Sequence, residues 1–435
     1  MAVRFLILLL LIGPVAFAQD DEWNDSGGDS WDDSGDEWVD DEKAGLQWTG
    51  FIEGALGSRW ESDPQTGSKG TLREARVRVE TDWTNDTLAI GFKGDALYDD
   101  IIEEFDIEIR DLTLAFSPGK NLDVKLGRQV LTWGTGDLLF LNDLFPKDWV
   151  SFFAGRDTEY LKAPSNSARF NLYTSVVNFD FVWTPIFEPD NYLDGERFSF
   201  FSPLAGGKVA PDPPLSANEP KKDFENGEFA LRLFRTIKGT EYALYGYRGF
   251  FKQPLGLNDQ LVPSFPPMTS IGASLRRSQW SGLFNSEVSY YFSRDDRSGT
   301  DPLIPNDQFR LLLGFEREAV TNFNVGVQYF LEWTQDHDEL IANSPTPEFE
   351  PDEFRHLFTT RLTYRAMMDK LIWSLFIFYS PSDEDYYLRP KLTYRRSDQW
   401  TFDVGLSLFG GDEEHTFFGQ LDDNSNAYVR VRYNY

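Results

Sequence analysis

The sequence predicts an all-β protein: a transmembrane, antiparallel, up-and-down β-barrel of about eighteen strands (roughly 16–20). Three observations predict this fold. The 435 residues are hydrophilic on average, with a mean hydropathy of −0.43, yet 16% of them are aromatic. Apolar and polar residues alternate with a period of two along much of the chain, and short connections take turns with long ones. An outer-membrane barrel, apolar outside, polar inside and girdled by aromatic residues, combines these features.

The composition excludes several classes of protein. The chain has no Cys and 3 His, so we expect no disulfide, no metal centre and no cofactor beyond loose divalent cations on acidic segments. The formal net charge of −30 argues against a nucleic-acid partner, because phosphates need clustered Lys and Arg. An enzyme is not expected, because His337, His356 and His415 belong to no recognisable catalytic motif.

The chain begins with an export signal. Residues 1–18 combine a basic start at Arg4, an apolar run over 5–15 and a small-residue pattern ending at Ala18. We predict a signal peptide that is cleaved between Ala18 and Gln19. An uncleaved anchor is the alternative, but the apolar run is shorter than the ~20 residues that a helical span needs.

An acidic leader follows over residues 19–45. Its segment 20–43 holds twelve acidic residues against Lys43, with three Trp spaced along it. Such a segment cannot bury enough apolar surface to fold, so we predict a disordered leader in the periplasm. The alternatives are a docking peptide for a periplasmic partner, with the Trp residues as anchors, or a loose binder of divalent cations.

Residues 46–435 form the predicted barrel, because their alternation has the period of a β-strand. In 323–333 (FNVGVQYFLEW) nearly every odd position is apolar or aromatic, and 71–83 and 400–409 alternate in the same way. The candidate strands are 46–60, 71–83, 87–98, 106–117, 122–130, 167–174, 176–185, 227–236, 240–250, 268–277, 282–292, 308–317, 323–333, 356–366, 371–380, 386–395, 400–409 and 426–435.

The connections distinguish a barrel from a soluble sandwich, which also alternates. Short connections carry turn residues and are expected on the periplasmic side together with the N-terminus of the barrel. The long connections, expected outside, include 131–166, 186–226, 251–267, 293–307, 334–355 and 410–425. A bacterial outer-membrane barrel segregates turns and loops in this way.

Aromatic residues and the C-terminus support the same topology. Two belts are predicted, where amphipathic rings meet the two membrane boundaries. The belts comprise Trp48, Trp83, Tyr364, Trp373, Tyr394, Trp400 and Tyr433 near the short turns, and Trp60, Tyr98, Trp183, Trp333 and Tyr379 near the long loops. The alternating, aromatic end at Tyr435 resembles the signal that the barrel assembly machinery reads. That machinery, outer-membrane lipid and lipopolysaccharide are therefore the expected partners.

Charged residues on the inward face predict an aqueous lumen, because a barrel of this size encloses more room than side chains fill. Glu74, Arg76, Arg78 and Glu80 are examples, and the strands near the C-terminus form a basic stripe of Arg389, Lys391, Arg395, Arg430 and Arg432. These charges either select solutes or pair across strands and stiffen the wall. The outer loops are acidic, so the two signals disagree and ion selectivity stays open.

The most distinctive stretch begins with Gly127-Arg128-Gln129 and continues through Trp133-Gly134. A long loop after such a strand folds either over the mouth or inward. The motif resembles a signature of porin-like outer-membrane families, including the alginate-export type and a related proteobacterial group. This resemblance implies a loop folded into the lumen after the fifth strand. The implied constriction residues are Arg128, Asp137, Asp143, Lys147 and Asp148. Strict alternation points Arg128 at lipid, so its role requires a bulge at Gly127.

The sequence therefore predicts an outer-membrane channel, or porin, for small polar or anionic solutes, constricted by the 131–166 loop. An export or structural barrel that couples to a periplasmic partner through the leader is the main alternative. An outer-membrane hydrolase is a minor alternative.

Overall fold

The computed structural model describes residues 47–435. The predicted signal peptide, its cleavage site and the acidic leader lie outside the described residues. Within the described part of the chain, no helix is both long enough and apolar enough to cross a membrane.

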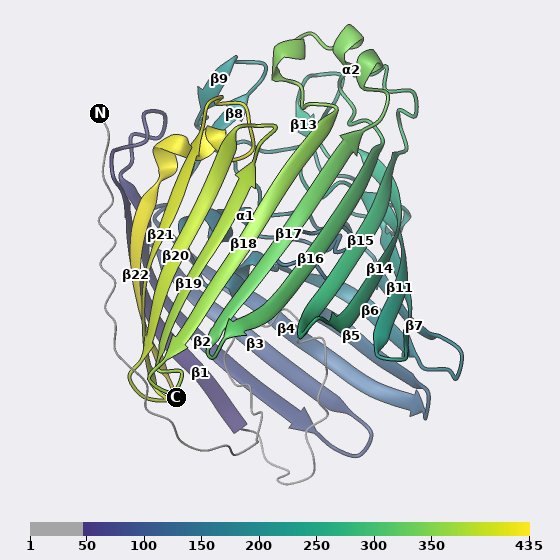
Figure 1. Ribbon diagram of the computed structural model, residues 1–435, viewed down its shortest axis with the longest axis vertical. Helices are drawn as coiled ribbons and strands as arrows, with labels where there is room; N and C mark the ends of the chain where they lie inside the picture. Colours follow the sequence, from purple (N-terminus) through teal and green to yellow (C-terminus); the bar gives the residue numbers. More distant parts are fainter. Residues whose placement is uncertain (1–46) are drawn as a thin grey trace. The chain divides into compact units, whose positions relative to one another are not determined.

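Eighteen antiparallel strands form one closed barrel, which confirms the predicted fold class (Figure 1). Each strand pairs with the next along the chain, and β22 pairs with β1 from Phe51↔Asn434 to Arg59↔Asn426, which closes the ring. The barrel strands are β1 (Gln47–Arg59), β2 (Gly70–Thr84), β3 (Ala89–Asp99), β4 (Glu104–Gly119), β5 (Leu122–Val130), β6 (Pro164–Leu172), β7 (Asn178–Thr184), β10 (Glu228–Ile237), β11 (Thr240–Phe250), β14 (Pro267–Gln279), β15 (Gly282–Ser293), β16 (Gln308–Val320), β17 (Phe323–Thr334), β18 (Phe354–Ala366), β19 (Leu371–Ser380), β20 (Asp385–Arg395), β21 (Trp400–Gly411) and β22 (Asn426–Asn434).

Short turns and long loops lie at opposite ends of the barrel, as the sequence predicts (Figure 1). Lys238-Gly239 and Trp280-Ser281 are two-residue turns in which both residues have positive φ, the conformation that matches the twist of paired strands. The loops hold the remaining elements, which are α1 (Trp149–Ala154), α2 (His337–Asn343), the 3-10 helices η1 (Thr158–Leu161), η2 (Phe224–Asn226), η3 (Pro347–Phe349) and η4 (Gly419–Asn424), and the short strands β8 (Phe200–Ser202), β9 (Gly207–Val209), β12 (Gly256–Leu257) and β13 (Pro263–Ser264).

The two faces of the barrel wall differ in chemistry. Ile52, Leu56 and Val77 are exposed on the outer face, whereas Arg76 and Arg78 are buried on the inner one. The alternation therefore sorts apolar side chains to the lipid side and charges to the lumen. Residues of the predicted aromatic belts follow the same plan. Trp373 lies opposite Tyr364 near a short turn, and Trp333 is the next-to-last residue of β17, at the long-loop end.

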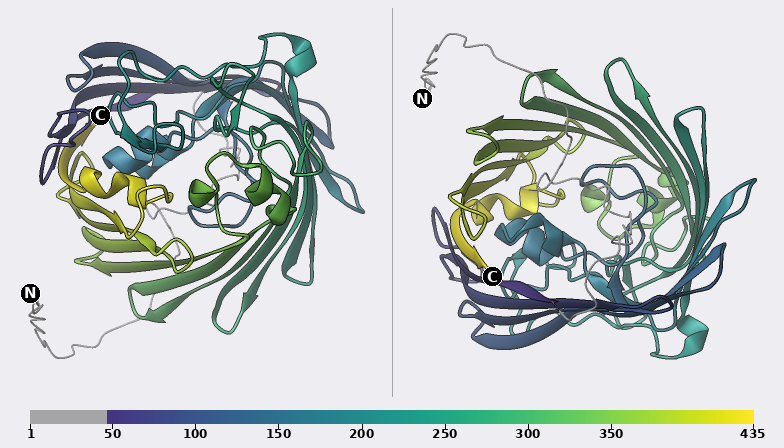
Figure 2. Two further views of the ribbon diagram at one scale, coloured as in Figure 1. Left: turned by 90° about the horizontal axis from the view of Figure 1, so that it is seen from above. Right: turned by 90° about the horizontal axis from the view of Figure 1, so that it is seen from below.

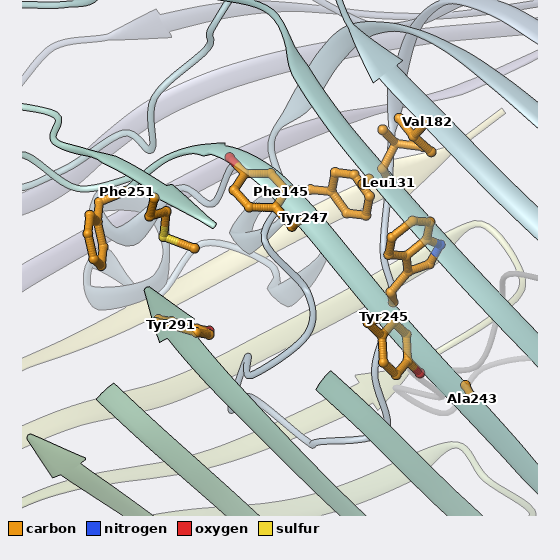
Figure 3. Packing of buried hydrophobic residues seen from close by; sticks show 11 residues of the cluster. Leu131, Phe145, Val182, Ala243, Tyr245, Tyr247, Phe251 and Tyr291 are labelled. Carbon is orange, nitrogen blue, oxygen red and sulfur yellow. The ribbon is translucent and has the colours of Figure 1, made fainter. Parts of the chain in front are cut away.

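The loop between β5 and β6 folds into the barrel, as predicted (Figure 2). Its first residues join an apolar cluster on the inner side of the wall, part of which is drawn in Figure 3. Within this cluster the rings of Trp133 and Phe145 lie 5.0 Å apart, and Trp133 lies 6.1 Å from Tyr245 of β11. The Trp133 Nε1–H also donates to Asp180 of β7, so the loop is fixed where it enters the lumen.

Candidate functional site

The inserted loop, residues 131–163, travels around the inner wall. It first crosses to β15, where the backbone N–H groups of Thr135 and Gly136 donate to the Glu287 carboxylate. The Asn142 side chain donates to the same carboxylate over 2.8 Å. One buried wall carboxylate thus fixes three points of the loop.

Asp137 extends the crossing to β17 and β18. The Arg361 guanidinium donates to its carboxylate over 2.6 Å, and Gln328 exchanges hydrogen bonds with its backbone N–H and C=O over 2.7 and 2.8 Å. A charge-assisted pair with two backbone hydrogen bonds is a strong local anchor. Asp137 therefore binds the wall of the lumen opposite the strand from which the loop starts.

The middle of the loop is held by its own side chains. Lys147 donates from Nζ to Asp143 over 3.0 Å and to the Phe145 carbonyl over 2.8 Å, and both charged side chains are almost fully buried. The Lys147 backbone N–H donates to Asp190, and burial raises the pKa of that carboxyl. These contacts fix the shape of the middle of the loop.

Helix α1 packs against the wall formed by β19, β20 and β21. Asp148 caps its N-terminus by accepting from the Ser151 N–H over 2.7 Å. The Phe152 ring lies 5.6 Å from Tyr387 and the Phe153 ring 5.7 Å from Phe409. The helix is short because Gly155 ends it in the left-handed conformation.

The return segment is tied to the wall by buried charges. Arg156 donates to Glu74 of β2 and to Asp99 at the end of β3, over 2.6 and 2.9 Å. The Tyr160 hydroxyl donates to Asp95 over 2.8 Å. The wall residue Arg110 donates to the backbone carbonyls of Lys162 and Glu159 in the loop, over 2.7 and 3.1 Å. The segment therefore lies against β2, β3 and β4.

Asp157 joins the return segment to β22. Its carboxylate lies 3.4 Å from Arg432 and 3.8 Å from Arg430, and both arginines also pair with Glu53 of β1. Burial alone would raise the pKa of Asp157, but the two guanidinium groups outweigh it and hold this pKa well below the usual range. The carboxylate stays ionised and keeps the loop attached.

Four of the five predicted constriction residues lie in the inserted loop, and the fifth, Arg128, lies in β5. Arg128 needed a bulge at Gly127, but β5 pairs with β4 and β6 without a shift there. Arg128 therefore keeps the face opposite Lys125 and Gln129. It donates to the Ile109 carbonyl over 2.7 Å and to Glu188 over 2.8 Å. The structure gives it partners in the wall and a neighbouring loop, and the constriction role predicted for it stays a prediction.

The predicted lumen charges are largely paired. Arg76 and Arg78 both bind Asp95, and Glu80 lies 3.6 Å from Lys93. In the basic stripe, Arg430 binds Asp403 over 3.1 Å and Arg389 lies over the rings of Phe152 and Tyr387. Lys391 and Arg395 of the same stripe are partly exposed. The stripe exists, but loop and wall carboxylates neutralise part of it.

Sequence reasoning missed two sets of residues. The first set, Arg156 and Asp157, anchors the return segment. The sequence signal for this set is a pair of adjacent charged residues that follows an apolar helix and its terminal Gly155. The second set is apolar yet faces inward, and it comprises Leu312, Phe330, Leu357, Phe376 and Phe378. Unbroken apolar runs such as 311–313 and 375–379 mark these positions, because such a run places an apolar side chain on both faces of a strand.

The chain is similar in structure to several solved barrels. One is OccAB4 of Acinetobacter baumannii, with a TM-score of 0.54 and 11% identity over 90% of this chain and 98% of that one. Pseudomonas aeruginosa OccK2, solved in complex with glucuronate, gives 0.54 and 8% over 89% and 97%. Pseudomonas aeruginosa OccK11 gives 0.51 and 10% over 89% and 95%. These likenesses place the fold in the porin-like barrel class. No protein-family model and no curated protein matches the chain.

Proposed function

We propose that this protein is a channel of the bacterial outer membrane that passes small polar solutes through a lumen narrowed by the inserted loop. The observation that carries the proposal is a 131–163 loop that lies inside a closed barrel and is anchored to β2, β15, β18 and β22. Because the loop is held at so many points, it narrows the lumen and gives the remaining opening a fixed shape. The apolar outer face and the two aromatic belts support a place in the membrane.

The proposed solutes are small and polar, and they include organic acids. Lys391 and Arg395 are partly exposed, and together with Arg430 and Arg432, which are engaged by carboxylates, they form a basic side of the lumen. OccK2, whose fold is similar, was solved with the acid glucuronate, a solute of the kind proposed here. The motif that begins at Gly127 resembles a signature of alginate-export porins, and this resemblance supports the same class of solute. The ion selectivity of the channel stays open.

Planar-bilayer recording of the purified, folded chain tests the proposal. We expect stable, stepwise currents that scale with salt concentration, and a reversal potential in a salt gradient that reports the preferred ion. Protein that inserts into the bilayer in folded form and yet carries no current would contradict the channel.

A further inference from the structure

A cavity of about 490 Å³ lies between the inserted loop and the long loops above it. Residues 138–152 of the inserted loop form one side of it, and the upper parts of β16 to β19 form another. Residues 250–255, 302–306 and 417–418 of the long loops complete it. Its size falls within the range of about 300–1,000 Å³ that is typical of small-molecule sites.

Aromatic rings dominate the wall of this cavity. Trp149 contributes from the inserted loop, with its ring 6.2 Å from Phe140 and 6.0 Å from Phe417. Phe330 and Phe378 contribute from the barrel wall, at positions where a purely water-filled lumen would carry polar side chains. Elsewhere in the lumen, β2 and β3 present Arg76, Arg78 and Asp95 in the same inward orientation. The inward face at the cavity is therefore apolar, whereas the inward face at β2 and β3 is charged.

The cations that line the cavity are all neutralised. Each of the four pairs with a carboxylate: Arg310 with Glu332 over 2.8 Å, Arg355 with Asp383 over 2.5 Å, Lys147 with Asp143 over 3.0 Å and Lys252 with Glu228 over 2.6 Å. Asp190 and Glu350 also line the cavity and add negative charge to these pairs, so an anionic ligand gains little from entering. The Arg310–Glu332 pair and Gln308 are partly accessible, and together they offer donors and acceptors to a hydroxyl group.

We propose that this cavity is a binding site for small, uncharged aromatic molecules that carry a hydroxyl group, the chemical class of phenol. The rings would pack the apolar body, and the Arg310–Glu332 pair or Gln308 would hold the hydroxyl. This inference rests on the proposed channel function and adds a capture step on the outer side of the inserted loop. Stacking and edge contacts with several rings favour an aromatic body over an aliphatic one of the same size.

Block of the channel current by phenol at pH 7, where its hydroxyl is protonated, tests the proposal. Phenol added on the long-loop side should interrupt the current in a concentration-dependent way. Benzoate, which has the ring but a full charge, and glycerol, which has hydroxyls but no ring, should act at least about threefold more weakly. Equal or stronger action by benzoate would overturn the uncharged class, and equal action by glycerol would overturn the aromatic site.

A matched pair of variants tests whether the Phe330 ring contributes to phenol binding. Phe330→Ala removes a ring from the cavity and should weaken phenol block by about two- to tenfold. Phe358→Ala removes the same side chain from the outer face, where Phe358 is 47% exposed, and should leave the block unchanged. Phe330→Leu keeps the apolar volume without the ring, and serves if the alanine variant folds poorly. Equal block in wild type and in the folded Phe330 variants would contradict the site.

Equilibrium binding separates this inference from the channel function. Saturation-transfer NMR of phenol with the purified protein detects the site whether or not the barrel conducts. Binding that Phe330→Ala reduces, in a protein without current, would keep the site and overturn the channel. Current without phenol binding would keep the channel and overturn the site.

Discussion

Asp157 shows how a single charge holds the loop in place. It is an ionised carboxylate between Arg430 and Arg432, inside a barrel whose wall also contributes Glu53. Removal of one partner from such a cluster leaves the other charge buried and uncompensated. The free-energy cost is larger than the pair would contribute in water. The contact between the return segment and β22 therefore depends on whether the Asp157 carboxylate is ionised.

We predict that Asp157→Asn loosens the return segment at neutral pH, by about 1–3 kcal/mol of anchoring free energy. Because the pKa of Asp157 is lowered in the folded protein, the anchoring is complete above the usual Asp pKa of about 3.9 and is lost only as the pH falls through the lowered value. Wild-type current should be steady from about pH 5 to 8 and become noisy in stronger acid. The current through the variant should be noisy over the whole pH range.

Asp352→Asn, in an exposed outer loop, is the control and should conduct like the wild type. Noise in the wild-type current that already rises at pH 6 would contradict the anchoring role of Asp157.

Gly155 is the second residue with a sharp structural requirement. It ends α1 with a φ of 85°, and a Cβ there would approach Tyr428 Cε1 to 2.4 Å. We predict that Gly155→Ala lowers the free energy of unfolding by about 1–3 kcal/mol more than Gly239→Ala does. Gly239 also has a positive φ, of 76°, but nothing lies within 4 Å of its Cβ position, so the difference isolates the clash. Equal losses in urea titrations of the two variants would show that Tyr428 moves aside freely.

At the scale of elements, the inserted loop behaves as part of the wall. Its basic residues, which are the sites of trypsin cleavage, are buried or bound: Lys147 is 3% exposed, Arg156 is bound to Glu74 and Asp99, and Lys162 donates to Thr132. The loop between β7 and β10 differs, because the side chain of Lys222 there is 71% exposed.

We predict that limited trypsin digestion of the folded protein cuts after Lys222 or its neighbour Lys221 and leaves 131–163 intact. Mass spectrometry of the fragments identifies the cut. Fragments that end at Lys147 or Arg156 under native conditions would contradict a loop fixed inside the barrel. The same digestion after unfolding is the control, and it should cut at all these sites.

The strands were predictable from the sequence, and the anchoring contacts were not. Period-two alternation and turn residues located all eighteen barrel strands, although β6 begins at Pro164, three residues before the expected 167. These signals are local. The pairing of Asp137 with Arg361, or of Asp157 with Arg432, joins residues more than 200 positions apart, and no local pattern encodes it. The bulge at Gly127 that the predicted role of Arg128 requires is likewise not encoded locally, and the register of β5 does not contain it.

At the scale of the whole molecule, closure by β1 and β22 makes an inside and an outside. Lys391 of β20 faces the lumen, where its charge acts on Asp157 of the inserted loop. Val404 of β21 lies on the outer face and is 51% exposed. The chain has no Cys, so a single introduced thiol is a unique label at either position.

The most direct test of the channel is therefore chemical modification during bilayer recording. A charged, water-soluble methanethiosulfonate reagent should change the current through Lys391→Cys in discrete steps. It should leave Val404→Cys and the cysteine-free wild type unchanged. If Lys391→Cys conducts but does not respond to the reagent, or if Val404→Cys responds equally, the current does not pass through this lumen.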